Sequence, residues 1–201
     1  MELHLNTQQG IRRKSNQDAL SYNDTFIHSK KKFDISEIIP NHNDHIFVIA
    51  DGMGGYAGGD FASNYTVREI YNEFIINKNS FDINRCINLI DDKLIEISKV
   101  DQSRSEMGTT VVSAIIRNNQ VNIFNVGDSG LYHITNRLIQ KKSVDDNLPG
   151  PNKSLITQCI GNFKQPLNIH LDNFEWKVGD YIVLVSDGVS DFISENTILI
   201  N

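Results

Sequence analysis

The sequence has few cysteines and prolines and no long apolar run, and each shortage excludes a class of protein. It has 2 cysteines and 4 prolines among 201 residues. Cys86 and Cys159 form no Cys-x-x-Cys pair, so we expect reduced thiols in a cytoplasmic protein rather than a disulfide framework. No apolar stretch approaches the roughly 20 residues of a membrane span, and the start, MELHLNTQQG, has neither the basic leader nor the apolar core of a secretory signal. We therefore predict a cytoplasmic protein that does not enter a membrane.

The charge balance excludes a typical nucleic-acid-binding surface. Acidic residues number 25 and basic residues 19, which gives a formal net charge of -6. Proteins that bind nucleic acid neutralise its phosphates with an excess of Lys and Arg, so we expect no nucleic-acid partner. The only basic cluster, SKKKF at 29–33, is interpreted as a solvated loop. The hydrophobic content of 39% is enough for a sizeable core, and we predict a single domain over residues 1–201.

The order of the apolar patterns predicts an α+β fold. Short runs rich in Val, Ile and aromatic residues predict strands at 45–50, 109–117, 121–126, 131–134 and 181–186. Asn-containing turns at 117–120 and 135–138 are typical of antiparallel hairpins. Between the first two strands, apolar residues recur at helical spacing over 67–75 and 83–97, with Asp82 as the expected N-cap of the second helix. Strands that pair as hairpins, with helices that arrive as a block, favour α+β with both helices on one sheet face.

Three of the predicted strands lead directly to an aspartate. Asp51, Asp128 and Asp187 each follow an apolar run within two residues, in VIADG, NVGDS and LVSDG. A single aspartate after a strand is a common turn residue. Several carboxylates at one sheet end, however, repel one another and titrate upward unless a cation lies among them. An all-oxygen set of this kind suits Mg²⁺ or Mn²⁺ better than zinc.

The segment after Asp51 contains five glycines in eight positions, from Gly52 to Gly59. Gly52, Gly54 and Ala57 satisfy the spacing of a dinucleotide-binding turn, which also requires an acidic residue at the end of a second strand about 20 positions later. That window falls inside the first helical pattern, around 71–73, so we reject this interpretation. Glycine has no Cβ to keep a cation or a phosphate away from the backbone, and we expect the run to serve that purpose.

Residues 10–20, GIRRKSNQDAL, combine two arginines with a polar Asn-Gln-Asp cluster. An arginine guanidinium donates two parallel hydrogen bonds to a phosphoryl group, which a lysine cannot do. If this segment stood alone, its arginines would be interpreted as surface cations.

Six segments occur in a characteristic order: GIRRKSNQDA, VIADGMGGYAGG, MGTTVV, NVGDSGLY, LITQCIGN and LVSDGVSD. This series strongly resembles that of the metal-dependent Ser/Thr protein phosphatases, the PPM or type 2C family, and particularly its compact bacterial members. The resemblance covers residues 10–194. It implies an α-β-β-α sandwich, in which two antiparallel sheets are flanked by helices, with a dinuclear metal centre at one end.

The resemblance also implies roles for single residues. Arg13 matches the family's phosphate-binding arginine, because it lies three residues before Asn16 and five before Asp18. Arg12 is then expected to have no role in phosphate binding. Asp18 matches the acid that holds metal-bound water.

The expected metal ligands come from the later motifs. Asp51 matches the carboxylate that bridges both ions, the carbonyl of Gly52 completes the protein ligands of the first, and Asp187 binds the second. In bacterial relatives a weaker third ion is associated with the aspartates that match Asp128 and Asp191.

By resemblance, the predicted activity is hydrolysis of phosphoserine and phosphothreonine in proteins. A water shared by two Mn²⁺ or Mg²⁺ ions attacks phosphorus while Arg13 binds the phosphoryl oxygens. The expected partners are phosphoproteins that a Ser/Thr kinase has modified. Two alternatives remain open: a regulatory module that binds phosphoproteins or a partner without turnover, and a phosphatase for small phosphomonoesters.

Two departures from the family bear on this prediction. The loop at 140–154 is shorter than the flap of relatives, although Asp145 and Asp146 within it could reach the site. The chain ends at SENTILIN, where relatives continue to a final Asp-Asn motif that supplies a ligand of the second metal. We therefore expect a C-terminally incomplete phosphatase domain, and three explanations remain open: a fragment, a natural short form that a partner completes, or a protein whose phosphatase activity is reduced or lost.

Overall fold

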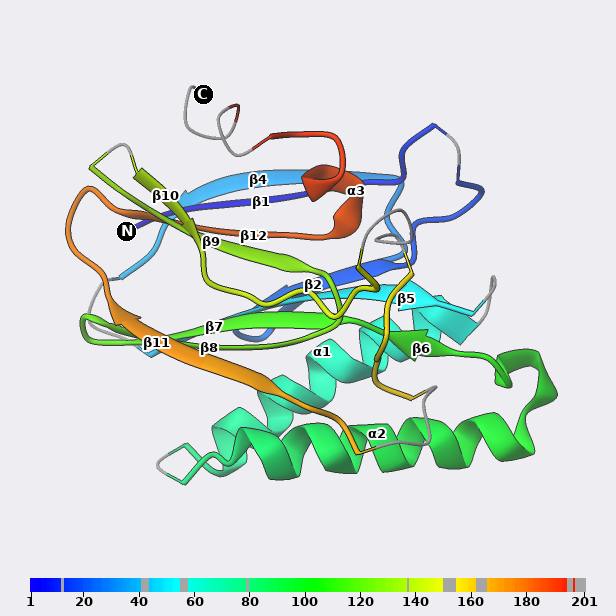
Figure 1. Ribbon diagram of the computed structural model, residues 1–201. Helices are drawn as coiled ribbons and strands as arrows, with labels where there is room; N and C mark the ends of the chain where they lie inside the picture. Colours follow the sequence, from blue (N-terminus) through cyan, green and yellow to red (C-terminus); the bar gives the residue numbers. More distant parts are fainter. Residues whose placement is uncertain are drawn as a thin grey trace.

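The computed structural model describes residues 1–11, 13–40, 44–54, 58–78, 80–136, 138–149, 155–161, 166–194 and 197. Within them the chain forms a pair of helices, a large antiparallel sheet and a second layer of strands, stacked in that order (Figure 1). Arg12, Ala57 and the end of the chain after 197 lie outside the described residues, so the expectations that concern them are not tested.

The large sheet forms the middle layer. Its strand order is β11 (His170–Glu175), β8 (Gln120–Val126), β7 (Val111–Arg117), β5 (His45–Met53), β2 (Asp18–Tyr22) and β3 (Thr25–His28), and the short β6 (Gly108–Thr109) pairs with the end of β5. All of these pairings are antiparallel. Every residue of β7 except Arg117 is buried, because the strand is covered on both faces.

The second layer consists of two smaller sheets. One pairs β1 (Glu2–Gln8) with β4 (Lys32–Ile38), and the other has the order β10 (Leu138–Lys141), β9 (Gly130–Thr135) and β12 (Tyr181–Val185). A group of six buried residues fills the space between this layer and the large sheet: Val112, Ala114, Ile116, Val121, Ile123 and Leu131.

The helices α1 (Gly58–Ile76) and α2 (Ile83–Val100) cover the opposite face of the large sheet (Figure 1). Val67, Ile70 and Phe74 of α1 pack with Ile87 and Leu94 of α2 in one buried cluster. Two shorter elements, η1 (Gln102–Arg104) and α3 (Asp187–Ser190), follow α2 and β12. No helix in the described part of the chain is long and apolar enough to cross a membrane.

The predicted α+β sandwich is confirmed, and so are the five strands and two helices expected from apolar runs. Asp82 caps α2 as expected, since its side chain accepts a hydrogen bond from the Arg85 N–H at 3.1 Å. Asn118 and Asn136 take the left-handed conformation in the two expected turns. Thr110 interrupts the strand predicted over 109–117 and divides it into β6 and β7.

One expectation about the site needs correction. The strand that precedes the glycine run does not end at Asp51 but continues through Gly52 to Met53. Gly52 and Met53 pair with Thr109 and Gly108 of β6, and this additional pairing extends the strand beyond Asp51. Asp51 is therefore held inside a strand, whereas Asp128 and Asp187 follow the ends of β8 and β12.

Candidate metal centre

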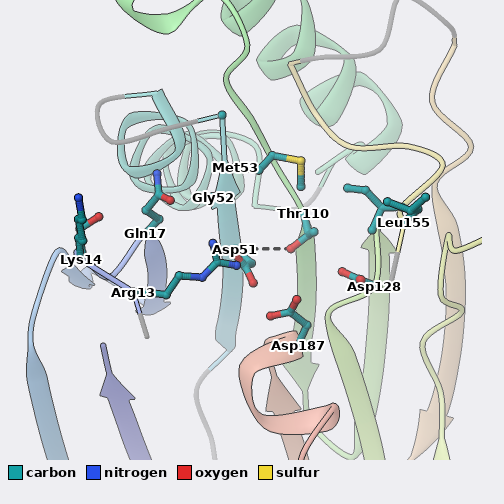
Figure 2. A pocket seen from close by; sticks show the side chains of 13 residues that line it. Arg13, Lys14, Gln17, Asp51, Gly52, Met53, Thr110, Asp128, Leu155 and Asp187 are labelled. Atoms are coloured by element: carbon teal, nitrogen blue, oxygen red, sulfur yellow. Dashed lines mark hydrogen bonds between the residues drawn. The ribbon is translucent and has the colours of Figure 1, made fainter. Parts of the chain in front are cut away.

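A pocket of about 540 Å³ lies at the end of the sandwich where the predicted site residues gather. It is lined by Arg13, Lys14, Ser15, Gln17, Asp51, Gly52, Met53, Gly54, Thr110, Asp128, Leu155, Ile156 and Asp187. In Figure 2 the three aspartates Asp51, Asp128 and Asp187 converge from different elements, and Arg13 approaches Asp51 from the side.

Asp18 and Asp51 lie directly opposite each other in the pairing of β2 with β5. Thr110 fixes the backbone of Asp51 from the other side: its hydroxyl accepts from the Asp51 N–H at 3.1 Å, and its N–H donates to the Asp51 carbonyl at 2.9 Å. The Thr109 hydroxyl also donates to the Asp51 carbonyl at 2.9 Å. These contacts hold the backbone of Asp51 in place and leave its carboxylate oxygens unused.

The backbone beside Asp51 is packed too closely for side chains. The Gly52 N–H donates to the Gln17 carbonyl at 3.2 Å. A Cβ on Gly52 would lie 2.1 Å from the Gly59 carbonyl oxygen, and a Cβ on Gly59 would lie 2.7 Å from the Gly52 carbonyl carbon. The two glycines thus allow the first turn of α1 to touch the end of β5, where Gly52 lines the pocket.

The carboxyl groups of the site raise each other's pKa. Burial raises the pKa of Asp51 well above its ordinary value, and the charges of Asp18, Asp187 and Asp128 add to the effect. Burial also raises the pKa of Asp18, although a hydrogen bond from Ser186 partly offsets it. For Asp128, burial and the charge of Asp187 raise the pKa to about 6. Carboxylates gathered in this way repel one another and favour the binding of a cation among them.

The donor set fits divalent metal ions. Among the described residues, no three Asp, Glu, His or Cys side chains form a ready-made ligand cluster. Mg²⁺ nevertheless keeps several waters and often uses only one or two protein carboxylates. The charges of Asp18 and Asp187 both raise the pKa of Asp51, so a cation among these carboxylates would relieve their repulsion. Oxygen ligands suit Mg²⁺ or Mn²⁺.

Not every predicted residue faces the pocket. Asp18, the cross-strand neighbour of Asp51, is not part of the lining. Asp191 follows α3, also outside the lining, yet its charge contributes to the raised pKa of Asp128. Asp145 pairs with Lys141 at 2.5 Å. Asp146 accepts from the Gly127 N–H at 2.7 Å, so neither loop aspartate lines the site.

Sequence reasoning missed several residues of the site. Lys14, Met53, Leu155 and Ile156 line the pocket, and Thr110 positions Asp51, but none was assigned a role in advance. The repeated threonine of MGTTVV is the one signal that could have been used, since two hydroxyls in a buried strand need hydrogen-bond partners.

Comparison with known proteins supports the resemblance to type 2C protein phosphatases. The family described as Protein phosphatase 2C matches residues 14–199. The serine/threonine phosphatase stp of Listeria monocytogenes serotype 4b is 26% identical over 178 residues, covering 76% of this chain and 69% of the relative. A putative 2C-type protein phosphatase of Streptococcus pyogenes serotype M6 is 28% identical over 225 residues, covering 99% and 83%.

Solved structures show the same fold. The S. agalactiae serine/threonine phosphatase superimposes with a TM-score of 0.81 at 23% identity, covering 99% of this chain and 84% of that one. For the phosphatase Stp1 of Staphylococcus aureus the TM-score is 0.78 at 25% identity, with 98% and 80% covered. These findings confirm the predicted fold and the enzyme class of a protein phosphatase. Because the family match covers almost the whole chain, this protein belongs to the protein phosphatase 2C family.

Proposed function

We propose that this chain hydrolyses phosphoserine and phosphothreonine in proteins with the help of Mn²⁺ or Mg²⁺. The observation that carries the proposal is the convergence of Asp51, Asp128 and Asp187 with Arg13 in one pocket. Buried carboxylates with raised pKa values cost stability, and a protein that only binds a partner has no physical need for them. The serine/threonine phosphatases among the relatives support the choice of substrate.

The residues that would hold the ions follow from the pocket lining and, for Asp191, from the resemblance of the motifs. Asp51 and the Gly52 carbonyl would bind the first ion, and Asp51 with Asp187 the second. Asp128 and Asp191 would contribute to a weaker third. Divalent ions at this position lower the pKa of a bound water and neutralise charge on phosphoryl oxygens.

The protein's own groups complete the chemistry. Asp18 lies outside the pocket lining but opposite Asp51 in the pairing of β2 with β5, so its carboxylate would accept a hydrogen bond from a water held beside Asp51 and orient it for attack on phosphorus. Arg13 is exposed at the rim and presents its guanidinium toward Asp51, where it can bind two phosphoryl oxygens at once (Figure 2). The negative charge that spreads over these oxygens during transfer then meets a fixed cation. The bond between phosphorus and the seryl or threonyl oxygen breaks, and the proton that the attacking water gives up ends on that oxygen, so the products are a free hydroxyl and inorganic phosphate.

The test is hydrolysis of a phosphothreonine peptide by this chain with Mn²⁺, with EDTA and with the Asp51→Ala variant. Asp92→Ala is the matched control, because Asp92 is an exposed acid on α2, away from the pocket. We expect turnover that requires the metal and Asp51 but not Asp92. A folded chain without turnover would contradict the proposal and favour a binding module. Faster hydrolysis of a sugar phosphate than of the peptide would contradict the substrate class.

Three finer points stay predictions. They are the supply of substrates by a Ser/Thr kinase, the cytoplasmic location, and a single phosphatase domain over residues 1–201.

A further inference from the structure

Four lysines, which we call the lysine patch, lie on two hydrogen-bonded backbone segments beside the pocket: Lys14, Lys30, Lys31 and Lys32. All four are exposed. Within the described part of the chain, none of them lies within ion-pair distance of a carboxylate. The acid that touches this loop, Asp60, contacts Ser29 and His28 rather than the lysines. In a chain with a formal net charge of -6, this is a local excess of free positive charge.

Hydrogen bonds fix the lysine patch against the segment that carries Arg13. The Gln9 N–H donates to the Lys31 carbonyl at 3.0 Å, and the Gln9 side chain donates to the Arg13 carbonyl at 2.8 Å. The Asn16 side chain donates to the Lys30 carbonyl at 3.0 Å and to the Thr7 hydroxyl at 2.7 Å.

The lysine patch lies next to the pocket because β4 begins beside the loop between β1 and β2. Lys32 begins β4 and pairs with Gln8 at the end of β1. In Figure 1 the start of β4 lies next to the loop between β1 and β2. Ser15 and Gln17, on either side of Asn16, line the pocket, and so does Lys14 itself. The patch is thus continuous with the entrance to the site.

The side of the pocket opposite Lys14 is apolar. Met53, Leu155 and Ile156 form an apolar part of the lining, and Figure 2 shows Leu155 across the site from Lys14. A peptide that places its phosphorylated residue over the aspartates can therefore extend past lysines in one direction and past apolar side chains in the other.

We propose that the lysine patch binds a segment rich in Asp and Glu that adjoins the phosphorylated residue of the substrate. This inference rests on the proposed function and specifies its substrate class. Lysine ammonium groups on flexible stems are point charges without the planar fork that selects a phosphate, so they suit a run of carboxylates. Because the patch is exposed, its contribution acts mainly on association and is weakened by salt.

The experiment compares phosphothreonine peptides that differ only in the flanking residues: an acidic run before the phosphothreonine, an acidic run after it, or neutral Gln and Ser on both sides. The test variant is Lys30→Gln/Lys31→Gln/Lys32→Gln. The control is Lys93→Gln/Lys99→Gln/Lys177→Gln, which removes the same charge at exposed positions outside the pocket lining. Melting temperatures of both variants verify that they are folded.

We expect wild type to prefer one of the acidic peptides, and the test variant to lose about tenfold in kcat/KM on that peptide at low salt. The loss on the neutral peptide stays within about twofold, and the control keeps the preference. At about 0.5 M salt the preference shrinks, since the Debye length falls below about 5 Å.

Several results would overturn the inference: no preference for either acidic peptide, an equal loss in both triple variants, or a preference that salt does not change. A loss confined to a peptide with a second phosphothreonine in place of the acidic run would also overturn it, because the occupant would then be a phosphate. If no peptide is hydrolysed, the proposed function fails. Binding of a labelled acidic peptide, measured by anisotropy, then still tests the lysine patch separately.

Discussion

The Ser186 hydroxyl donates a 2.9 Å hydrogen bond to Oδ2 of Asp18 and so joins residues 168 positions apart in the sequence. Ser186 occupies the N-cap position of α3, where a serine usually accepts a hydrogen bond from the helix backbone, but its side chain makes no such bond. Its hydroxyl is used instead to hold Asp18, and it partly offsets the rise in the pKa of that carboxyl that burial causes. Ser186 therefore acts as a positioning residue for the site.

Replacement of this hydroxyl tests that role. We expect Ser186→Ala to lower kcat/KM on a phosphothreonine peptide by about 10 to 100-fold, the loss typical of residues that orient a metal-site group. The melting temperature should change little, because the side chain caps no helix. Ser190→Ala, on the same helix, is the control and should retain activity. Equal activity in the two variants would show that Asp18 does not depend on Ser186.

The sequence allowed the fold to be predicted where apolar residues dominate. The cores of β5, β7 and β8 are runs of Val, Ile and Phe, which indicate strands directly. By contrast, β1 (ELHLNTQ) and β4 (KFDISEI) are largely exposed and polar, and only their pairing with each other makes them strands. Their apolar signal is too weak to be recognised in isolation.

The candidate site, like the fold, was predictable only where apolar runs mark its position in the sequence. Asp51, Asp128 and Asp187 were recognisable because each follows an apolar run. The link from Ser186 to Asp18 and the position of the lysines at 30–32 were not, because both depend on segments that meet only in the folded chain. The lysines of the basic cluster at 29–33 are exposed as expected, but the loop interpretation was wrong for Lys32 and Phe33, which begin β4 because they pair with β1.

The Asp51 carboxylate should lower the stability of the metal-free protein while it supports phosphatase activity. Its burial and the neighbouring charges of Asp18 and Asp187 make the ionised carboxylate costly without metal. We expect Asp51→Asn to raise the melting temperature in EDTA while lowering phosphatase activity by about 100-fold or more, since even supporting residues cost 10 to 100-fold. Mn²⁺ should raise the melting temperature of wild type but not of the variant.

Differential scanning fluorimetry with and without Mn²⁺ measures both effects, and Asp92→Asn serves as the control. A variant that melts below wild type in EDTA would contradict the claim that the Asp51 charge destabilises the metal-free protein.

Gly52 should be intolerant of any side chain. A Cβ at this position would lie 2.1 Å from the Gly59 carbonyl oxygen and 2.8 Å from the Gln17 carbonyl oxygen, and both are backbone atoms that cannot rotate away. We expect Gly52→Ala to reduce the free energy of unfolding by about 3 kcal/mol, at the upper end of typical overpacking costs. Gly188→Ala is the control, since the nearest atom to its added Cβ is the Ser186 hydroxyl at 3.9 Å. Urea denaturation measures both, and equal midpoints would refute the close contact between β5 and α1.

Stability should also depend on pH through Asp91, which is remote from the pocket lining. This buried carboxylate on α2 accepts a 2.6 Å hydrogen bond from the Gly161 N–H. Burial, and to a lesser degree the charge of Asp92, raise the pKa of Asp91 above its ordinary value of 3.8, although the hydrogen bond opposes them. Because the folded pKa is the higher one, the ionised group costs stability at neutral pH, about 1.4 kcal/mol for each unit of increase.

Asp91→Asn keeps an oxygen to accept the Gly161 N–H but removes the charge, so we expect the variant to be more stable than wild type at pH 7. As the pH falls through the raised pKa toward 3.8, the native Asp91 takes up its proton before the unfolded chain does. Wild type then gains stability relative to the variant, and the difference between them shrinks. Urea denaturation of both proteins at pH 7 and near pH 4, with Asp92→Asn as the exposed control, measures this. A stability difference that is the same at both pH values would mean that Asp91 acts through packing and not through its charge.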